Sequence, residues 1–288
     1  MASQRQLKGR IRSVKSTKQI TKAMQMVAAS KMRRAQDATK ASHPYEHAAG
    51  ELLAFLSHQG VTRMHKWFVE RPVKSRMIIL IAADKGLAGA YNANVLKAYL
   101  ANLRSDDKDG IKNTTIAVGR KASALVSRLK DTDIAGTYEN LADQPEGAQF
   151  YAILNTAKDA FESGEVDAVD VVYTKFISSM TQVADTFRLF PAGFDQQDEG
   201  GIANETEFEP SAEEVLDDVA YRLIGSRLFQ ALLDARASEH SMRMLAMKNA
   251  TDNASGLVDD LTLEMNKARQ AAITQELAEI SGGSEAMK

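Results

Sequence analysis

The two ends of the chain are long stretches with few helix-breaking residues, and they constrain the fold more than any other feature. Residues 3–57 are rich in Ala, Lys, Met, Gln and Arg, and residues 211–280 contain no proline. At a rise of 1.5 Å per residue they predict helices of about 80 and about 105 Å. The roughly 120 residues between them form too small a domain to bury such helices. We therefore expect the two helices to pair with each other as an antiparallel coiled coil.

Apolar residues in both stretches recur at four- and three-residue steps, the spacing of a narrow helix seam. The N-terminal stretch has two such triplets, Leu7–Ile11–Val14 and Ile20–Met24–Val27. The irregular step between them predicts a three-residue insertion that locally overwinds the coil. The C-terminal seam runs through Leu228, Leu232, Ala235, Glu239, Met242 and Ala246, and resumes at Leu257, Leu261, Ala268 and Ala272.

The middle of the chain alternates between short apolar runs and amphipathic segments. Strands are expected at 76–83, 114–118, 168–177 and 182–190, and helices at 92–103, 120–130 and 147–161. This alternation predicts a small, mainly parallel α/β sheet whose last two strands form a hairpin at its edge. The predicted fold class is an α/β insertion plus a long antiparallel α-helical coiled coil formed by the N- and C-terminal helices.

Four domains follow from these patterns. They are an N-terminal coiled-coil helix (1–60), a Rossmann-like α/β globular domain (72–191), a Gly- and acid-rich foot loop (192–210) and a C-terminal coiled-coil helix (211–288).

The chemistry-bearing patterns predict no catalytic, cofactor-binding or metal site. The turn Asp84–Gly89 follows a strand and precedes a helix, where a phosphate loop would lie, but it lacks the Gly-Lys-Ser/Thr ending of that motif. We interpret it as a tight structural connection. Cysteine is absent, which excludes disulfides and thiolate chemistry. No apolar run approaches the 18–20 or so residues of a membrane-spanning helix.

Charge is distributed unevenly along a chain whose net charge is only −2. The first forty residues carry one acid, Asp37, and eleven bases: Arg5, Lys8, Arg10, Arg12, Lys15, Lys18, Lys22, Lys31, Arg33, Arg34 and Lys40. A solvated helix face is one explanation and docking against an acidic protein partner is another. Nucleic-acid binding is a third, but this segment has no aromatic side chains for stacking on bases.

Three segments carry a resemblance to a known family. The N-terminal segment is Ile20-Thr21-Lys22-Ala23-Met24-Gln25-Met26-Val27-Ala28-Ala29-Ser30-Lys31-Met32. The C-terminal segment has three parts: Met247-Lys248-Asn249-Ala250-Thr251-Asp252-Asn253-Ala254, Asn266-Lys267-Ala268-Arg269-Gln270 and Ile273-Thr274-Gln275-Glu276-Leu277. The third segment, between the other two, is the turn Asp84–Gly89 with Asn92. In their order along the chain the three segments resemble the gamma subunits of bacterial F-type ATP synthases, the central stalk of the F1 part.

The resemblance implies a non-catalytic rotor shaft that couples proton (or sodium) flow through the c ring to conformational cycling of the catalytic beta subunits. The implied partners are three alpha and three beta subunits, the epsilon subunit and the c-subunit ring, with no nucleic acid and no cofactor. The implied location is peripheral, at the cytoplasmic face of the bacterial inner membrane.

The resemblance also implies two sets of contact residues. The residues expected at the alpha/beta ring are Lys22, Met24, Lys31, Arg269, Gln270, Thr274 and Glu276, and those of the foot at the c ring and epsilon are Asn204, Glu205, Thr206, Glu207 and Phe208. Two alternatives stay open from the residues alone. One is a nucleotide-binding enzyme built on the α/β segment, and the other is a structural or nucleic-acid-binding coiled-coil protein.

Overall fold

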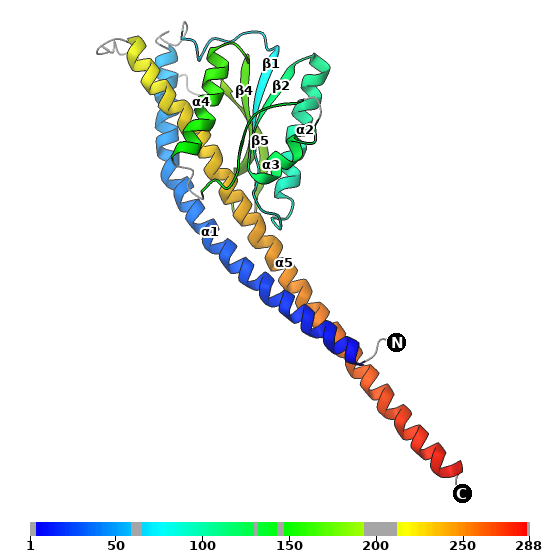
Figure 1. Ribbon diagram of the computed structural model, residues 1–288. Helices are drawn as coiled ribbons and strands as arrows, with labels where there is room; N and C mark the ends of the chain where they lie inside the picture. Colours follow the sequence, from blue (N-terminus) through cyan, green and yellow to red (C-terminus); the bar gives the residue numbers. More distant parts are fainter. Residues whose placement is uncertain (1–3, 59–64, 130–131, 143–146, 193–211, 287–288) are drawn as a thin grey trace. The chain divides into compact units, whose positions relative to one another are not determined.

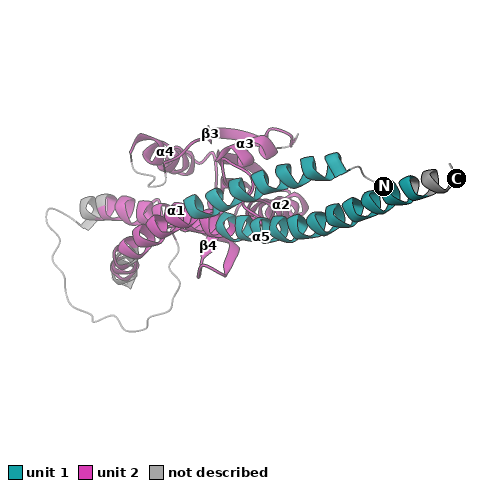
Figure 2. Ribbon diagram, turned by 90° about the horizontal axis from the view of Figure 1, so that it is seen from below, with its two compact units in different colours: residues 1–28, 243–288 teal, residues 29–242 magenta. Residues whose placement is uncertain are grey.

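The computed structural model describes residues 4–58, 65–129, 132–142, 147–192 and 212–286 (Figure 1). The chain forms two compact units, which Figure 2 shows in different colours. Unit 1 consists of residues 1–28 and 243–288, and unit 2 of residues 29–242. None of the helices in the described ranges has an apolar stretch of the length and hydropathy that a bilayer crossing requires.

Unit 2 contains a five-stranded sheet in the order β3-β2-β1-β4-β5. The strands are β1 (Ser75–Ile81), β2 (Lys112–Val118), β3 (Asp133–Tyr138), β4 (Ala168–Phe176) and β5 (Gln182–Phe190). The pairs β1·β2, β1·β4 and β2·β3 are parallel, and β4·β5 is antiparallel. The expected mainly parallel sheet with an edge hairpin is therefore confirmed.

Helices cover both faces of this sheet (Figure 1). On one face, α2 (Tyr91–Asp109) and α3 (Arg120–Val126) pack on Ile78 and Leu80. On the other face, α4 (Ala148–Glu162) and α5 (Ala212–Ala286) pack on Met77, Ile79 and Ile81. Successive residues of β1 thus point into opposite cores, as the period-two geometry of a strand requires. Because both faces are covered, the strand is a continuous apolar run.

The two terminal helices are as long as the sequence predicts. Helix α1 spans Gln4–His58 and α5 spans Ala212–Ala286. In unit 1 they lie side by side (Figures 1 and 2), and their contacts run in opposite directions along the chain. Near its start α1 contributes Leu7 and Ile11 to an apolar cluster with Leu261. Farther along, Thr21 meets the earlier α5 residue Thr251. The predicted antiparallel coiled coil is confirmed.

The middle of this coil is polar. Lys18 Nζ donates to Ser255 Oγ at 2.9 Å, and Thr251 Oγ1 donates to Thr21 Oγ1 at 2.8 Å. These residues continue the four- and three-residue steps that begin at Leu7. The steps pass through Leu7, Ile11, Val14, Lys18, Thr21, Gln25 and Ala28 on α1, all of which are buried or half-buried.

The predicted insertion in the N-terminal seam was therefore wrong. Ile20 and Val27 are 58% and 59% exposed and lie outside the seam. The seam keeps its heptad spacing because polar side chains fill the positions between the two apolar ends. The same error affected α5, where Leu257 is 44% exposed while Leu261 and Ala268 lie in the seam.

Within unit 2, α5 is buried on nearly all sides. From Leu223 to Ser241 only Arg227, Phe229 and Arg236 are not buried, and those three are half-buried. Gly225 lies at the closest approach of α4, since a Cβ added there would be 3.1 Å from Leu154 Cδ2. The glycine thus serves close helix packing, although it lowers the helix propensity of α5.

The sequence analysis missed strand β3. Its six residues, Asp-Ile-Ala-Gly-Thr-Tyr, are exposed or half-buried throughout. An edge strand of this kind has no apolar run or regular alternation to mark it.

Candidate functional site

The carboxyl end of the sheet in unit 2 is where a ligand would be expected in a fold of this class. Parallel α/β sheets bind ligands outside the carboxyl ends of the strands, at the point where the strand order reverses. Here that point lies between β1 and β4, the two strands from which the order β3-β2-β1-β4-β5 departs in opposite directions. The turn Asp84–Gly89 follows β1 at this edge.

Polar groups of this turn bind other parts of the chain. Asp84 Oδ1 accepts hydrogen bonds from the backbone N–H groups of Arg120 (3.1 Å) and Asn140 (3.0 Å). Asn92 Oδ1 accepts one from the backbone N–H of Ala83 (3.0 Å). A carboxylate of the protein thus takes up the N–H group at the start of α3, where a bound phosphate is often found in other α/β proteins.

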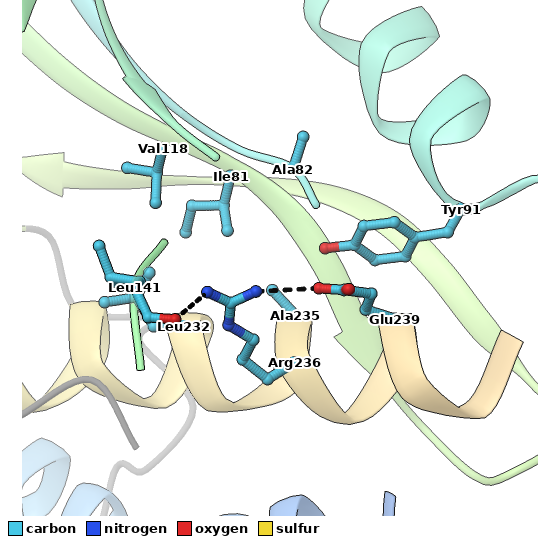
Figure 3. A pocket seen from close by; sticks show the side chains of 9 residues that line it. All are labelled: Ile81, Ala82, Tyr91, Val118, Leu141, Leu232, Ala235, Arg236 and Glu239. Atoms are coloured by element: carbon cyan, nitrogen blue, oxygen red, sulfur yellow. Dashed lines mark hydrogen bonds and ion pairs between the residues drawn. The ribbon is translucent and has the colours of Figure 1, made fainter. Parts of the chain in front are cut away.

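Arg236 of α5 closes the crevice from the other side (Figure 3). Its Nη2 donates to the carbonyl oxygen of Leu141 (2.7 Å) and lies 3.6 Å from Asp84 Oδ2, and its Nη1 donates to Glu239 Oε2 (3.0 Å). Burial of the side chain opposes its charge, but Glu239, Tyr91 and Asp84 outweigh burial and raise the pKa of Arg236. The guanidinium is therefore charged at every physiological pH.

The space left at this point is about 10 Å³, enclosed by Ile81, Ala82, Tyr91, Val118, Leu141, Leu232, Ala235, Arg236 and Glu239. Ligand pockets typically measure about 300–1,000 Å³. The crevice has no room for a nucleotide, because side chains of the protein fill it. Through Asp84, the turn Asp84–Gly89 connects the end of β1 to the segments that follow β2 and β3.

A second candidate site is the basic face of α1 in unit 1. Lys8, Arg12, Lys15 and Lys22 are all exposed. Lys22 Nζ donates to Gln25 Oε1 at 3.3 Å, within its own helix. Met24 is half-buried. Lys31 lies in unit 2 and is half-buried.

A third candidate site is the end of α5. Residues 269–278 are exposed without exception, and the seam contacts of α5 end at Ala268. Four of the predicted contact residues, Arg269, Gln270, Thr274 and Glu276, lie in this segment. Thr274 Oγ1 donates to the carbonyl oxygen of Gln270 (2.9 Å), a bond within the helix. The side chains of residues 269–278 are thus exposed on every side of the helix.

The predicted foot residues Asn204, Glu205, Thr206, Glu207 and Phe208 lie outside the described residues. Sequence reasoning also missed two groups that the structure brings together. One is Arg236 with Asp84, separated by 152 residues in the chain with no motif to link them. The other is the polar part of the seam, which an exclusively apolar pattern overlooks.

Comparisons with known proteins give one consistent result. The family model described as ATP synthase matches residues 3–287. The ATP synthase gamma chains of Stenotrophomonas maltophilia and Macrococcus caseolyticus are 39% and 38% identical over 288 residues, which is all of this chain and all of theirs.

Solved structures show the same fold at low sequence identity. A chain of the Euglena gracilis mitochondrial ATP synthase (OSCP/F1/c-ring) matches with a TM-score of 0.67 and 20% identity, covering 99% of this chain and 94% of that one. A chain of the Tetrahymena thermophila mitochondrial ATP synthase central stalk and c-ring matches with a TM-score of 0.61 and 24% identity, covering 80% and 99%.

Proposed function

The chain belongs to the ATP synthase family, and from this premise we propose that it is the central rotor shaft of an F-type ATP synthase. Its full-length relatives are named gamma chains. The observation that carries the proposal is the joint presence of a coiled coil of the two chain ends and an α5 segment that extends beyond its partner helix. The function is mechanical: the shaft couples proton or sodium flow through a c ring to conformational cycling of catalytic beta subunits.

The end of α5 has the pattern of a contact surface. Ile273, Leu277 and Ile280 are 50%, 62% and 71% exposed and recur at four- and three-residue steps, so they share one face of the helix. Isolated exposed apolar residues need no explanation, but an aligned row of them indicates an interaction surface. We assign this row to contact with the surrounding alpha/beta ring.

Polar residues flank the apolar row on both sides. At 3.6 residues per turn, Arg269 and Glu276 fall on one side of it and Gln270 and Thr274 on the other. An apolar centre with a polar rim is the usual anatomy of a protein interface. In the proposed complex these four side chains hydrogen-bond to the ring.

The basic face of α1 supplies a second set of contacts. Eleven bases against one acid in residues 1–40 favour an acidic protein partner. We place Lys22, Met24 and Lys31 next to acidic loops of the beta subunits. The α/β domain (72–191), the foot loop (192–210) and the adjoining ends of the coiled-coil segments 1–60 and 211–288 would then contact the epsilon subunit and the c ring.

The complex formed by this family is membrane-associated, and we place this chain at the periphery of that membrane. The finer location proposed is the cytoplasmic face of the bacterial inner membrane. Its support is the kinship with bacterial gamma chains.

The shaft acts through its lack of symmetry. Three chemically identical sites around one asymmetric shaft each meet a different face of it, and rotation therefore exchanges their conformations. Moving one site from 1:99 to 99:1 between two states requires a bias of about 5.5 kcal/mol. Several charge-assisted hydrogen bonds, each contributing about 1.5–3 kcal/mol, supply a bias of this size. No catalytic residue is needed in the shaft itself.

The closed crevice argues against the alternative of a nucleotide-binding enzyme. Arg236 and Asp84 occupy the place where such an enzyme binds its ligand, and about 10 Å³ remain.

Replacing Arg269 and Gln270 together by Ala tests the proposal. The chain is co-expressed with the other subunits of an ATP synthase, including the c ring and the rest of the membrane sector, and ATP synthesis is measured in energised membrane vesicles. We expect the variant to fold and assemble but to synthesise ATP more slowly, because the interface loses a charged and an amide hydrogen bond.

The matched control is Lys97→Ala with Arg104→Ala, two exposed residues of α2 that the proposal does not place at the alpha/beta ring. Equal synthesis by both variants would refute the placement of the α5 end. Failure of the unmodified chain to assemble with alpha and beta subunits would refute the rotor function itself.

A further inference from the structure

The attachment of α5 to the sheet of unit 2 has features that packing alone does not require. Arg236 binds the turn after β1 through Asp84 and the segment after β3 through Leu141. Asp84 in turn holds the backbone N–H groups of Arg120 and Asn140. One α5 side chain is therefore connected to the loops at the carboxyl ends of β1, β2 and β3.

A second set of polar contacts joins α5 to the other half of the sheet, which is formed by β4 and β5. Ser238 Oγ donates to the carbonyl oxygen of Thr174 in β4 (3.3 Å). Ser241 Oγ donates to the carbonyl oxygen of Ser179 (2.6 Å) and accepts a hydrogen bond from Gln182 Nε2 (3.3 Å). These partners belong to β4, to the β4–β5 turn and to the start of β5. The helix is thus fixed from both halves of the sheet within six residues, 236–241.

Stability alone does not account for Arg236. Its neighbours Ile81, Val118 and Leu232 are apolar, and its side chain is only 13% exposed. Replacing a buried ion pair by apolar residues of similar volume is often neutral or stabilising. What an ion pair adds is direction, since the charge is satisfied in one orientation of the helix only.

The orientation that the ion pair fixes is the rotation of α5 about its own axis. Neighbouring residues of a helix point about 100° apart. A slip of one residue would carry the guanidinium away from Asp84 and Leu141 and leave a buried charge without its partners, which is strongly unfavourable. Apolar side chains around a helix oppose such a slip less, because hydrophobic contact is not directional.

We propose that Arg236, with Asp84 on one side and Ser241 on the other, is a rotational lock that fixes α5 against the sheet of unit 2. The inference rests on the proposed function, because resistance of α5 to rotation about its own axis matters in a shaft that transmits torque. Arg236 is a positioning residue: it keeps the orientation of α5 tied to that of the α/β domain.

The variant Arg236→Met tests the lock, since methionine retains much of the length of arginine but cannot bind Asp84, Leu141 or Glu239. The full chain is assembled with its ATP synthase partners in vesicles, and ATP hydrolysis and ATP-driven ion pumping are measured on the same sample. We expect hydrolysis at the unmodified rate and a loss of ions pumped per ATP. Arg236→Lys, which keeps the charge but not the two-pronged geometry, should recover part of the loss.

The matched control is Arg222→Met, an exposed arginine of the same helix, which should pump as the unmodified chain does. Adding Asp84→Asn to Arg236→Met should cost no further pumping, because the two residues act as one unit. An unchanged ratio of pumping to hydrolysis in Arg236→Met would overturn the proposal. If that variant does not fold, Ser241→Ala provides the same test. It removes the hydrogen bonds of α5 to Ser179 and Gln182 and leaves no buried charge unpaired.

A measurement on the isolated full chain separates the lock from the rotor function. The chain has no cysteine, so spin labels can be placed at Arg222→Cys on α5 and Lys97→Cys on α2. Pulsed electron–electron distance measurements should give a narrow distribution for the otherwise unmodified chain and a broader one for Arg236→Met. Equal widths would refute the lock even if the chain is a rotor. Failed assembly together with a broadened distribution would refute the rotor and leave the lock standing.

Discussion

Helix α5 packs in two different ways along its length. In unit 2, residues 223–241 are buried on nearly every side by the sheet and neighbouring helices. In unit 1, from Met247 onward, the covered side of the helix is a seam that includes Met247, Thr251, Ala254, Val258, Leu261, Met265 and Ala268. The first environment resembles a protein core, and the second is the narrow seam of a two-helix coil.

The difference shows where polar residues can serve specificity. In the coil the polar residues Lys18, Thr21, Thr251 and Ser255 lie at the seam and bind one another across it. A polar pair in a seam fixes register at some cost in stability. In unit 2, Ser238 and Ser241 of α5 are 0% exposed, and they bind Thr174 of β4 and Ser179 of the β4–β5 turn. The polar contacts of the coil fix the position of α5 along its axis, and those in unit 2 fix its rotation about that axis.

The largest expected effect comes from a substitution in unit 2, at Gly119. Gly119 has φ +92° and lies where an added Cβ would be 2.1 Å from the backbone oxygen of Ala82. Gly119→Ala should cost more than about 4 kcal/mol, because relief requires moving the end of β1. Gly110→Ala is the control, with φ +69° but no atom within 4 Å of the added Cβ. It should cost only about 1 kcal/mol. Urea unfolding followed by circular dichroism distinguishes them, and similar midpoints would contradict the prediction.

Truncating the same residue type in both units compares them directly. Leu228 in unit 2 and Leu261 in the coil are 0% and 3% exposed. Both Leu→Ala changes fall in the range of about 2–5 kcal/mol, with Leu228→Ala at the upper end because a surrounded site cannot collapse onto the cavity. Hydrogen exchange of amides near each site gives the local free energy of opening. A larger loss at Leu261 would show that the coil is the more rigid region.

Removing the hydroxyl pair of the coil should have a smaller effect of the opposite sign. The double variant Thr21→Val, Thr251→Val replaces both partners with apolar groups of the same shape. We expect unit 1 to gain up to about 1 kcal/mol, because such paired replacements are neutral or stabilising.

Register should become less well defined in this variant. An engineered disulfide between Val14→Cys and Val258→Cys, residues of the same apolar cluster, should form more slowly than with the threonines in place. Faster disulfide formation in the valine background would refute the role of the threonines in register.

The smallest effect concerns Asp167, which precedes β4 and binds the start of β1. Its carboxylate accepts the backbone N–H groups of Lys74 (2.8 Å) and Ser75 (3.0 Å). The hydrogen bond from Lys74, with those of Ser75 and the charge of Arg71, lowers the pKa of Asp167. A lowered pKa in the folded state gives stability that is present above the unfolded value, near 3.9, and is lost as the pH falls through the folded value.

Asp167→Asn should therefore destabilise the chain slightly at neutral pH and not at all in strong acid. Asp106 provides the contrast, because burial raises its pKa. Its contribution should have the opposite pH dependence, being lost as the pH rises. Unfolding midpoints measured across the acid range test both signs. A pH-independent difference for Asp167→Asn would contradict the assignment.

The sequence predicted the regular parts of this molecule well. Strand β1 and most of β4 are apolar runs, β2 ends in the apolar residues Ile116, Ala117 and Val118, and the long helices have no proline where their seams lie. These features are local, so a window of ten to twenty residues contains them. The exposed strand β3 has no such local signal.

What could not be predicted depends on distant partners. Nothing near Arg236 or Asp84 indicates that they meet, because their contact is a property of the folded sheet. The seam was misread for a different reason: Lys18 and Thr21 are polar, and a pattern built on apolar residues passes over them. The contacts of Arg269 and its neighbours need partner chains, and they remain predictions.

The exposed end of α5 has a consequence for assembly. Residues 269–278 of α5 are exposed, and most of the stability of a helix in a protein comes from tertiary packing of one of its faces. In the free subunit this end should open and close on its own, with amide protons exchanging rapidly and proteases cutting there first. Entering a surrounding ring would order it, so part of the binding free energy is used in folding the last turns, and assembly itself completes the helix.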